Sequence, residues 1–278
     1  MSIRAALPRD PRISQIAFLS VFLGTGLAWL GFELPPWQPP LIIATALGTQ
    51  WAMTHLTGAP PSGYRSPLIS SLGLSLLLRT DVPWIPVLAA FAAIASKFTI
   101  RFRGKHIFNP TNFGLAVAML LTPRAWCSPS QWGDNAALIA WLAILGLAVA
   151  HRAFRSDISL AFLGSWLLLK ASRVIYLGQR LPVLVHQLST GSLILFAFFM
   201  ISDPKTTPDS RLGRVLYAMI VASFAFYWQH GLWKQNALIW SLFLLSPLVP
   251  LIDRIFKADR YHWPIERTAS CLPASIPI

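Results

Sequence analysis

The chain has 278 residues, of which 55 % are apolar and only 12 % are charged. Because an average soluble protein has about 25 % charged residues, this composition excludes a disordered chain and disfavours an ordinary soluble domain. The net charge is +13, but the lysines and arginines lie in short gaps between long apolar blocks. This pattern is typical of a protein that crosses the lipid bilayer many times, and it disfavours a surface that binds nucleic acid.

The apolar blocks predict an all-α, polytopic membrane protein with about ten transmembrane segments. A helix needs about 20 residues to cross the hydrocarbon core, and the third, fourth and fifth blocks are shorter than that. Such half-helices are tolerated where they line a cavity enclosed by protein. In chain order, we expect the segments at Ile13–Phe32, Pro40–Thr57, Ser66–Leu78, Val82–Phe98, Ile107–Leu121, Asn135–Ala150, Ile158–Leu177, Leu184–Ile201, Gly213–His230 and Gln235–Ile255.

The distribution of cations predicts how these segments are oriented. With the N-terminus inside, the inner loops and tails hold 17 of the 23 lysines and arginines, in agreement with the positive-inside rule. We therefore expect a multi-pass protein of the cell inner (cytoplasmic) membrane with both termini in the cytoplasm. The N-tail would cover residues 1–12, the transmembrane domain residues 13–255 and the C-tail residues 256–278.

Ten segments divide into five and five, and an odd number per half places the halves in opposite orientations. The count therefore predicts a 5+5 inverted repeat, with repeat one over residues 13–122 and repeat two over residues 134–255. Similar stretches favour the same division. Ser71-Leu72-Gly73 in repeat one and Ser189-Thr190-Gly191 in repeat two are each followed by an apolar run and an aspartate.

The most distinctive stretch is KHIFNPTNFG at residues 105–114. Asn109 before Pro110 predicts the start of a helix, because an asparagine side chain accepts backbone N–H bonds at a cap and proline suits the first turn. The partial positive charge of that helix end, together with Lys105, suits an anionic or polarised group such as a flavin ring edge or a phosphate. The alternative is a plain helix cap beside a lysine that sets membrane topology.

A second stretch, MISDPKTTP at residues 200–208, contains an aspartate before a proline. The pair predicts that the preceding apolar helix ends in a turn. Asp203 would then cap the next element, pair with Lys205 or Arg211, or orient a ligand.

The sequence contains no recognisable catalytic or metal centre. The motifs HExxH, GxSxG and GxxxxGK[ST] are absent, so nothing favours a hydrolase or an ATPase. Cys127 and Cys271 are far apart and outside any CxxC spacing, and we expect neither a zinc site nor a disulfide framework.

Three motifs resemble those of the RnfD/NqrB family, the membrane subunits of ion-translocating ferredoxin:NAD and NADH:quinone oxidoreductases. Lys97 and the basic loop that follows it are similar to the family's lysine-glycine loop, and Phe108-Asn109-Pro110 is similar to its FNPA-type motif. FMISDP at residues 199–204 is similar to F-M-x-[ST]-D-P, and SPLVPLID at residues 246–253 is similar to N-x-L-V-P-L-I-D. The similarity extends from about residue 66 to residue 253.

The resemblance implies a ten-helix inverted repeat with a flavin between its halves. It also implies a membrane subunit of an oxidoreductase complex rather than a stand-alone enzyme, with other membrane redox subunits as partners. The cofactor-binding residues that it implies are Lys105, Asn109, Pro110, Thr111, Asn112, Ser202 and Asp203.

The chain departs from the family pattern in one loop. Family members that carry covalent FMN have an S-G-A-T-type motif on the outer loop after the fifth helix, whose threonine holds the phosphate ester. The corresponding loop here, Thr122–Asp134, reads TPRAWCSPSQWGD and lacks that motif. We therefore expect a noncovalent flavin, FMN or riboflavin, in a shorter UnbU-like variant of the family.

Two other functions are compatible with the same scaffold, because one fold hosts many functions. The first is a channel or transporter for a small solute, and the shortage of buried acids favours a neutral or organic solute over protons. The second is a membrane component of a natural-product biosynthetic assembly.

Overall fold

The computed structural model describes residues 10–29, 31–59, 63–128 and 136–261, and most of them form helices. The prediction of a helical chain is therefore confirmed. The predicted tails before residue 10 and after residue 261 lie outside the described residues, as do residues 129–134 of the loop after the fifth segment.

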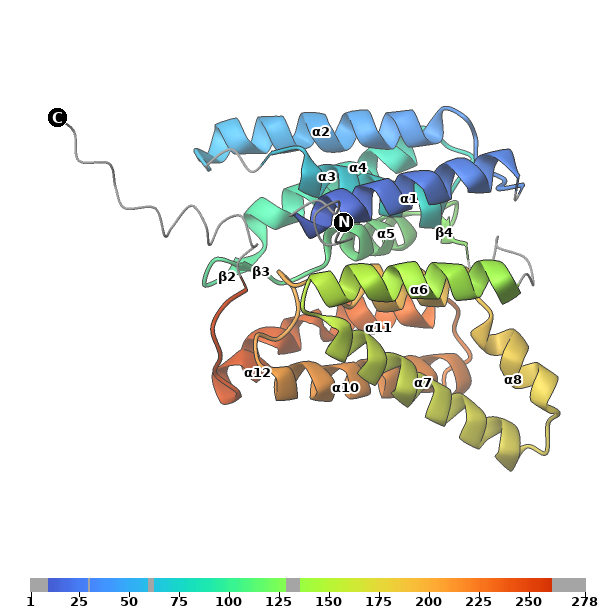
Figure 1. The fold of residues 1–278 in the computed structure, drawn as a ribbon. Helices are drawn as coiled ribbons and strands as arrows, with labels where there is room; N and C mark the ends of the chain where they lie inside the picture. Colours follow the sequence, from blue (N-terminus) through green and yellow to red (C-terminus); the bar gives the residue numbers. More distant parts are fainter. Residues whose placement is uncertain (1–9, 30, 60–62, 129–135, 262–278) are drawn as a thin grey trace, which may run out of the picture.

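The first half of the chain forms the upper layer in Figure 1, and its helices follow the predicted segments closely. Strand β1 pairs with β4 and strand β2 with β3, both antiparallel. The elements are α1 (Pro11–Ala28), α2 (Gln38–Thr57), α3 (Arg65–Leu77), β1 (Leu78–Arg79), α4 (Trp84–Thr99), β2 (Arg101–Phe102), β3 (Lys105–His106), α5 (Pro110–Leu121) and β4 (Trp126–Cys127).

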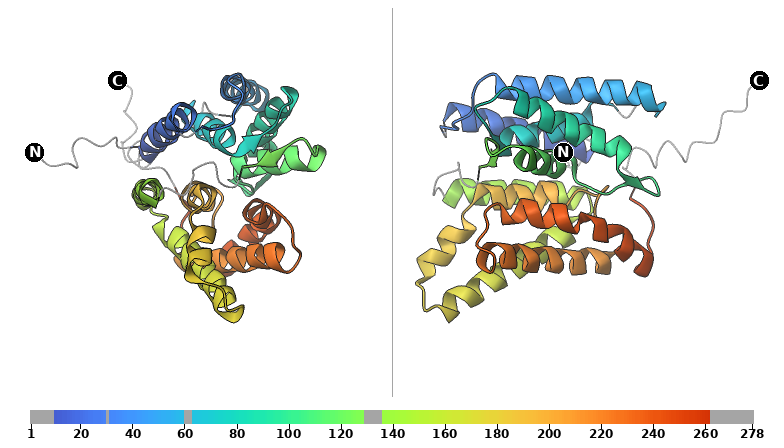
Figure 2. Two further views of the ribbon diagram at one scale, coloured as in Figure 1. Left: turned by 90° about the vertical axis from the view of Figure 1, so that its right-hand side faces the viewer. Right: turned by 180° about the vertical axis from the view of Figure 1, so that it is seen from behind.

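The second half forms the lower layer, and the two views in Figure 2 also show the halves as separate layers. Its elements are α6 (Ala136–Arg152), α7 (Ser156–Tyr176), α8 (Leu181–Leu188), α9 (Gly191–Leu195), the π-helix η2 (Phe196–Met200), α10 (Arg211–His230), α11 (Ala237–Leu245), the 3-10 helix η3 (Ser246–Leu248) and α12 (Val249–Ile255).

The predicted segment Leu184–Ile201 differs from the structure, because the chain breaks within it. Helix α8 ends at Leu188, α9 begins at Gly191, and the two parts are bent by 54°. Serine and threonine favour such non-helical positions, since their hydroxyls compete for backbone hydrogen bonds. Ser189 and Thr190 therefore mark a break that the apolar pattern alone did not reveal.

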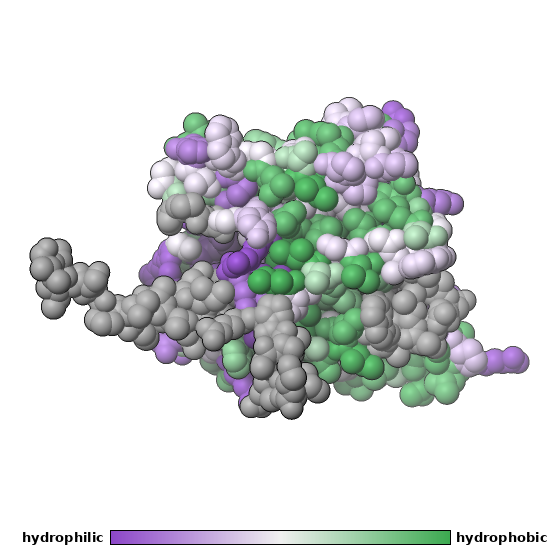
Figure 3. Space-filling model, turned by 45° about the horizontal axis from the view of Figure 1, so that its top comes forward, coloured by the Kyte–Doolittle hydropathy of each residue, from purple (hydrophilic) through white to green (hydrophobic). Residues whose placement is uncertain are grey.

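Two helices in the described part of the chain are long and apolar enough to cross a membrane, namely Ser156–Tyr176 and Ala237–Ile255. The bent pair of α8 with α9 and η2 adds a third candidate, and α4, α5 and Ala143–Arg152 are shorter apolar helices. Figure 3 shows hydrophobic residues gathered across the middle of one face, with hydrophilic residues toward its edges. An apolar surface of that extent suits contact with lipid.

The same helix pairings occur in both halves. Helix α2 packs against α4 as α7 packs against α10, and α4 packs against α5 as α10 packs against α11. Helix α1 contacts α3, and α6 contacts α9 and η2.

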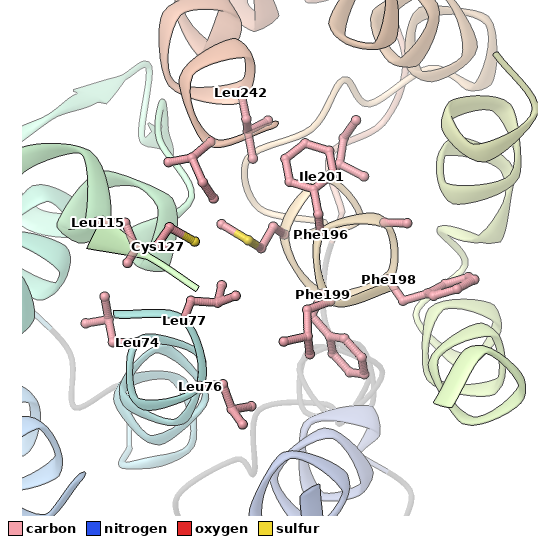
Figure 4. Close-up of a cluster of buried hydrophobic side chains, with 14 of the residues drawn as sticks. Leu74, Leu76, Leu77, Leu115, Cys127, Phe196, Phe198, Phe199, Ile201 and Leu242 are labelled. Carbon is pink, nitrogen blue, oxygen red and sulfur yellow. The ribbon is translucent and has the colours of Figure 1, made fainter. Parts of the chain in front are cut away.

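Short helices from the two halves meet in the middle of the molecule. Figure 4 shows Leu77 at the end of α3 on one side of this boundary and Phe196 and Phe199 of η2 on the other. The start of α3 lies near the end of η2, because Ser66 and Asp203 line one pocket. The end of α3 lies near the start of α9, because Leu77 and Thr190 line another. Helix α3 and the continuous short helix formed by α9 and η2 thus run in opposite directions.

A buried arginine satisfies the C-terminal end of α3. Arg79 is 3 % exposed, and its Nη1 donates to the carbonyls of Ser75 and Leu78 at 3.2 and 2.7 Å. Its Nη2 donates to the carbonyl of Leu76 at 3.2 Å. These bonds satisfy carbonyls at the end of the helix, of which the carbonyl of Leu78 also accepts Nε2 of Gln38 at 2.8 Å. The positive charge of Arg79 lies at the negative end of the helix dipole, which is favourable.

Helices α4 and α5 approach each other closely at a glycine. A Cβ atom on Gly114 would lie 2.4 Å from the carbonyl oxygen of Ala89 and 3.0 Å from the Cβ of Ala93. Small residues of this kind let helix backbones pack directly in membrane proteins.

We expect Gly114→Ala to destabilise the protein by about 1–3 kcal/mol, because the added methyl group overpacks the contact between α4 and α5. The matched control is Gly164→Ala on α7, where a Cβ atom would meet nothing within 4 Å. There the higher helix propensity of alanine is expected to leave stability unchanged or raise it by up to about 1 kcal/mol. Thermal unfolding in detergent measures both, and equal effects would contradict the close approach.

Candidate functional site

Asn109 begins helix α5 as the sequence predicted. Its side-chain Oδ1 accepts the backbone N–H of Asn112 at 3.1 Å, and Pro110 occupies the first turn. Asn109 is buried, so this bond replaces water at a helix end that solvent does not reach.

The same side chain joins the two halves of the molecule. Asn109 Nδ2 lies 3.3 Å from the carbonyl oxygen of Met200, at the end of η2, and 3.3 Å from Asp203 Oδ2. The two distinctive sequence motifs, separated by more than 80 residues, are therefore in direct contact.

Asp203 organises the turn that follows η2. Its Oδ1 accepts the backbone N–H of Lys205 at 3.0 Å, and its carbonyl oxygen accepts the hydroxyls of Thr206 and Thr207 at 3.4 and 3.0 Å. Burial raises the pKa of Asp203, although the N–H of Lys205 and nearby lysines oppose that effect. The N-cap of the next helix, α10, is Ser210 and not Asp203.

Asn109 and Asp203 line a pocket of about 100 Å³, here called the polar pocket. It lies between the start of α3, the start of α5 and the turn after η2. Five of the seven predicted residues line it, namely Asn109, Pro110, Thr111, Ser202 and Asp203. The Thr111 hydroxyl donates to the carbonyl of Ser70 at 3.4 Å, and the Ser202 hydroxyl donates to the carbonyl of Phe198.

The other two predicted residues lie outside the polar pocket. Lys105 Nζ forms ion pairs with Asp209 and Asp253 at 3.0 and 2.7 Å. Asn112 is fully buried, and its Nδ2 donates to the carbonyl of Ile239 at 3.0 Å, which ties α5 to α11. Both side chains join the halves away from the pocket.

The structure adds Lys97 and His106 to the pocket lining. Lys97 is buried, and its Nζ donates to Gln50 Oε1 and Ser66 Oγ, each at 3.0 Å. The available sequence signal was a lysine inside an apolar block, since ionisable residues within membrane segments usually mark functional positions.

His106 remains neutral at physiological pH. Burial lowers its pKa to about 4, and the positive charges of Arg101, Lys97 and Lys205 act in the same direction. Its ring bonds the backbone of Lys97, while its buried Nδ1 has no hydrogen-bond partner among the described residues. With the ring proton on Nε2, Nδ1 of this pocket-lining side chain is an unpaired acceptor, which suits a ligand hydroxyl or N–H.

A second and larger cavity, of about 330 Å³, lies at the opposite end of the two short helices. It is lined by apolar side chains such as Leu77 and Phe196 and by polar ones that include His186, Thr190 and Asn236. Its volume falls within the range of about 300–1,000 Å³ that is typical of small-molecule sites. We call it the large cavity.

A buried lysine lies in the wall of the large cavity. Lys170 is 2 % exposed, and its Nζ lies 2.9 Å from Gln229 Oε1, 3.0 Å from His230 Nε2 and 4.7 Å from the centre of the Trp166 ring. None of the ion pairs among the described residues includes it. Together with Lys234, which also lines the cavity, this cation favours ligands with acceptor or anionic groups.

Comparison with known proteins assigns the family. The model of the NQR2, RnfD, RnfE family matches residues 127–262. The D subunit of an ion-translocating oxidoreductase complex from Stutzerimonas stutzeri is 30 % identical, over 80 % of this chain and 83 % of the relative. The chain belongs to this family.

Two further relatives carry similar names. One is the D subunit of a proton-translocating ferredoxin:NAD(+) oxidoreductase complex from Clostridium ljungdahlii, 24 % identical over 70 % of this chain and 74 % of its own. The other is the D subunit of an ion-translocating oxidoreductase complex from Pseudomonas paraeruginosa, 25 % identical over 87 % and 85 %. The resemblance found in the sequence motifs is confirmed at the level of the family, whose members are membrane proteins of electron-transport complexes.

We expect stability to fall as the pH is lowered from about 7 toward 4, in part because of His106. The pKa of His106 is about 4 in the folded chain and about 6.5 in an unfolded chain. The unfolded chain therefore binds the proton first, and its binding lowers the free energy of unfolding. His106→Gln is expected to reduce this slope in thermal unfolding at pH 7, 6 and 5, whereas His55→Gln, at an exposed position, serves as the control. An unchanged slope in His106→Gln would contradict a buried neutral ring.

Proposed function

We propose that the protein is the membrane subunit of an ion-translocating electron-transport complex and binds a flavin noncovalently between its two halves. The observation that carries this proposal is the contact of Asn109 with Met200 and Asp203 at 3.3 Å, which brings the two family motifs together beside a pocket. Since the relatives are named as subunits of complexes, the proposed partners are other membrane redox subunits together with the lipid bilayer.

The proposed architecture is a 5+5 inverted repeat with ten membrane segments in the inner membrane. It is supported by the equivalent pairings of α2 with α4 and of α7 with α10. The opposite directions of α3 and η2 support it as well, since half-helices related by an in-plane axis run antiparallel. The positive-inside distribution supports cytoplasmic termini.

The residues present fit a flavin in two places. The large cavity has the volume and the largely apolar walls that a flat ring system requires, with Lys170, Thr190 and Asn236 as polar groups. The polar pocket, at about 100 Å³, is too small for three fused rings but suits a ring edge or a hydroxylated chain. Its groups for such a ligand are Asn109, Asp203 and the free acceptor of His106.

When bound, a flavin supplies the electron-transfer chemistry. The residues of the chain hold and tune it. Asn109 and the turn of Asp203 fix the polar contacts, Lys97 places a positive charge near them, and the apolar walls exclude water.

Noncovalent attachment is supported by the loop after α5. The hydroxyl oxygen of Thr122 accepts the backbone N–H of Arg124 at 3.2 Å, and Thr122 and Ser128 are both buried. A buried hydroxyl is poorly placed to carry a charged phosphate ester, and Ser130 lies outside the described residues. The proposal accordingly includes a shorter UnbU-like variant of the family.

The test is the flavin content of the purified chain, read from visible absorption before and after acid precipitation. We expect flavin that leaves with acid. If the flavin contacts the polar pocket, Asn109→Ala is expected to lower flavin occupancy. If the flavin ring lies in the large cavity, Thr190→Trp is expected to lower flavin occupancy, because the tryptophan side chain fills that cavity.

Ser210→Ala provides the matched control, because it also removes a helix N-cap but lies outside both pockets. Its occupancy should equal that of the wild type. Full occupancy in both Asn109→Ala and Thr190→Trp would contradict the proposed sites. Flavin retained on the polypeptide after acid would contradict noncovalent binding, and solute flux by flavin-free protein in liposomes would favour the transporter alternative.

A further inference from the structure

A third pocket, of about 160 Å³, lies between the β2–β3 hairpin and the end of α12, and the only residue that it shares with the polar pocket is His106. Four exposed cations line it, namely Arg103, Arg254, Lys257 and Arg260. We call it the basic pocket.

The acidic side chains in the basic pocket are already engaged. Asp209 and Asp253 both bind Lys105, and Asp253 Oδ1 also accepts the backbone N–H of Asp209 at 2.9 Å. Asp259 is exposed and does not line the pocket. The ion pairs among the described residues include none of the four cations. They therefore repel one another across a small space, and a bound anion would relieve that repulsion.

Two of the guanidinium groups are held in place by one aromatic ring. The Cζ atoms of Arg103 and Arg254 lie 5.6 and 5.4 Å from the centre of the Phe102 ring. Cation–π contacts at these distances are favourable, and fixing the side chains before a ligand arrives lowers the entropy cost of binding.

The turn of the hairpin leaves room for a third guanidinium group. Arg103 and Gly104 have φ values of 49° and 81°, in the left-handed region that favours glycine. A Cβ atom on Gly104 would lie 3.7 Å from Arg260 Nη1, so Arg260 extends over the bare turn. Three arginines thus line one small pocket, and planar guanidinium groups match the geometry of a phosphate.

The basic pocket adjoins an apolar surface. Leu251 and Ile255 are exposed and, four residues apart, lie on one face of α12. Leu244 is exposed earlier in the same candidate span, Ala237–Ile255. This face ends at Arg254 and Lys257. An acyl chain along it would bring a headgroup to the pocket.

We propose that the basic pocket binds a phosphate group, supplied by the headgroup of an anionic phospholipid. Basic pockets beside membrane helices recognise such headgroups by charge. The four cations of the basic pocket line neither proposed flavin site, and the proposal does not depend on a bound flavin.

The test follows thermal unfolding of the full chain in detergent at constant ionic strength. The added ligands are short-chain phosphatidylglycerol, phosphatidylcholine of the same chain length, and inorganic phosphate. We expect phosphatidylglycerol to raise the Tm of the wild type and phosphatidylcholine to have no comparable effect. The double variant Arg103→Gln with Lys257→Gln removes two pocket cations. It should raise the phosphatidylglycerol concentration at the midpoint of the Tm titration about 25-fold, because each cation near a membrane surface contributes roughly fivefold to lipid affinity.

The matched control is Arg180→Gln with Arg211→Gln, which removes two exposed cations outside the pocket and should keep the wild-type midpoint. If inorganic phosphate raises the Tm as much as phosphatidylglycerol does and loses its effect in the same variants, the result would support a phosphate site and assign it to free phosphate. The proposal is overturned if phosphatidylcholine raises the Tm as much as phosphatidylglycerol does, or if the pocket variant keeps the wild-type midpoint. It is also overturned if the midpoint of the control variant shifts as far as that of the pocket variant.

Discussion

The side-chain amide of Asn109 holds the centre of the molecule together. Its oxygen caps α5, while its nitrogen donates to the last carbonyl of η2 and to Asp203. One buried side chain thus satisfies helix ends from both halves. Without it, the N–H of Asn112 would lose its side-chain partner, and the carbonyl of Met200 would keep only the N–H of Asp203 at 3.3 Å. A polar group left without a partner costs several kcal/mol where water is absent.

The need for such side-chain partners at helix ends arises from the short helices. A helix that stops within the apolar interior leaves carbonyls unpaired, and each half of the chain solves the problem differently. Arg79 donates to the end of α3, and Asn109 donates to the end of η2. Polar groups are thereby fixed at opposite ends of the boundary between the halves, next to the large cavity and the polar pocket respectively. The cavities are consequences of how the helices end.

Local sequence signals predicted the parts of the site that depend on local chemistry. Asn109 before Pro110 predicted a helix start, and Asp203 before Pro204 predicted a turn, because each of these features depends only on neighbouring residues in the sequence. The choice of partners was not predictable in this way. Lys105 pairs with Asp209 and Asp253, which are more than 100 residues away in the sequence. The tertiary fold therefore determines that Lys105 lies outside the polar pocket. Asn112 likewise serves the contact between α5 and α11. The break at Ser189 and Thr190 was hidden because both residues lie inside the predicted segment Leu184–Ile201, whose length suits a single span.

The central claim is that Asn109 and Asp203 couple the two halves, and a double-mutant cycle tests it most directly. The free energy of unfolding is measured for the wild type, Asn109→Ala, Asp203→Ala and the double variant. The account predicts a coupling of about 0.5–3 kcal/mol, as for residues in direct contact. A parallel cycle of Asn109→Ala with Ser210→Ala, a helix cap outside the polar pocket, should be additive within about 0.5 kcal/mol. Additivity of Asn109 and Asp203 to the same degree would contradict the account.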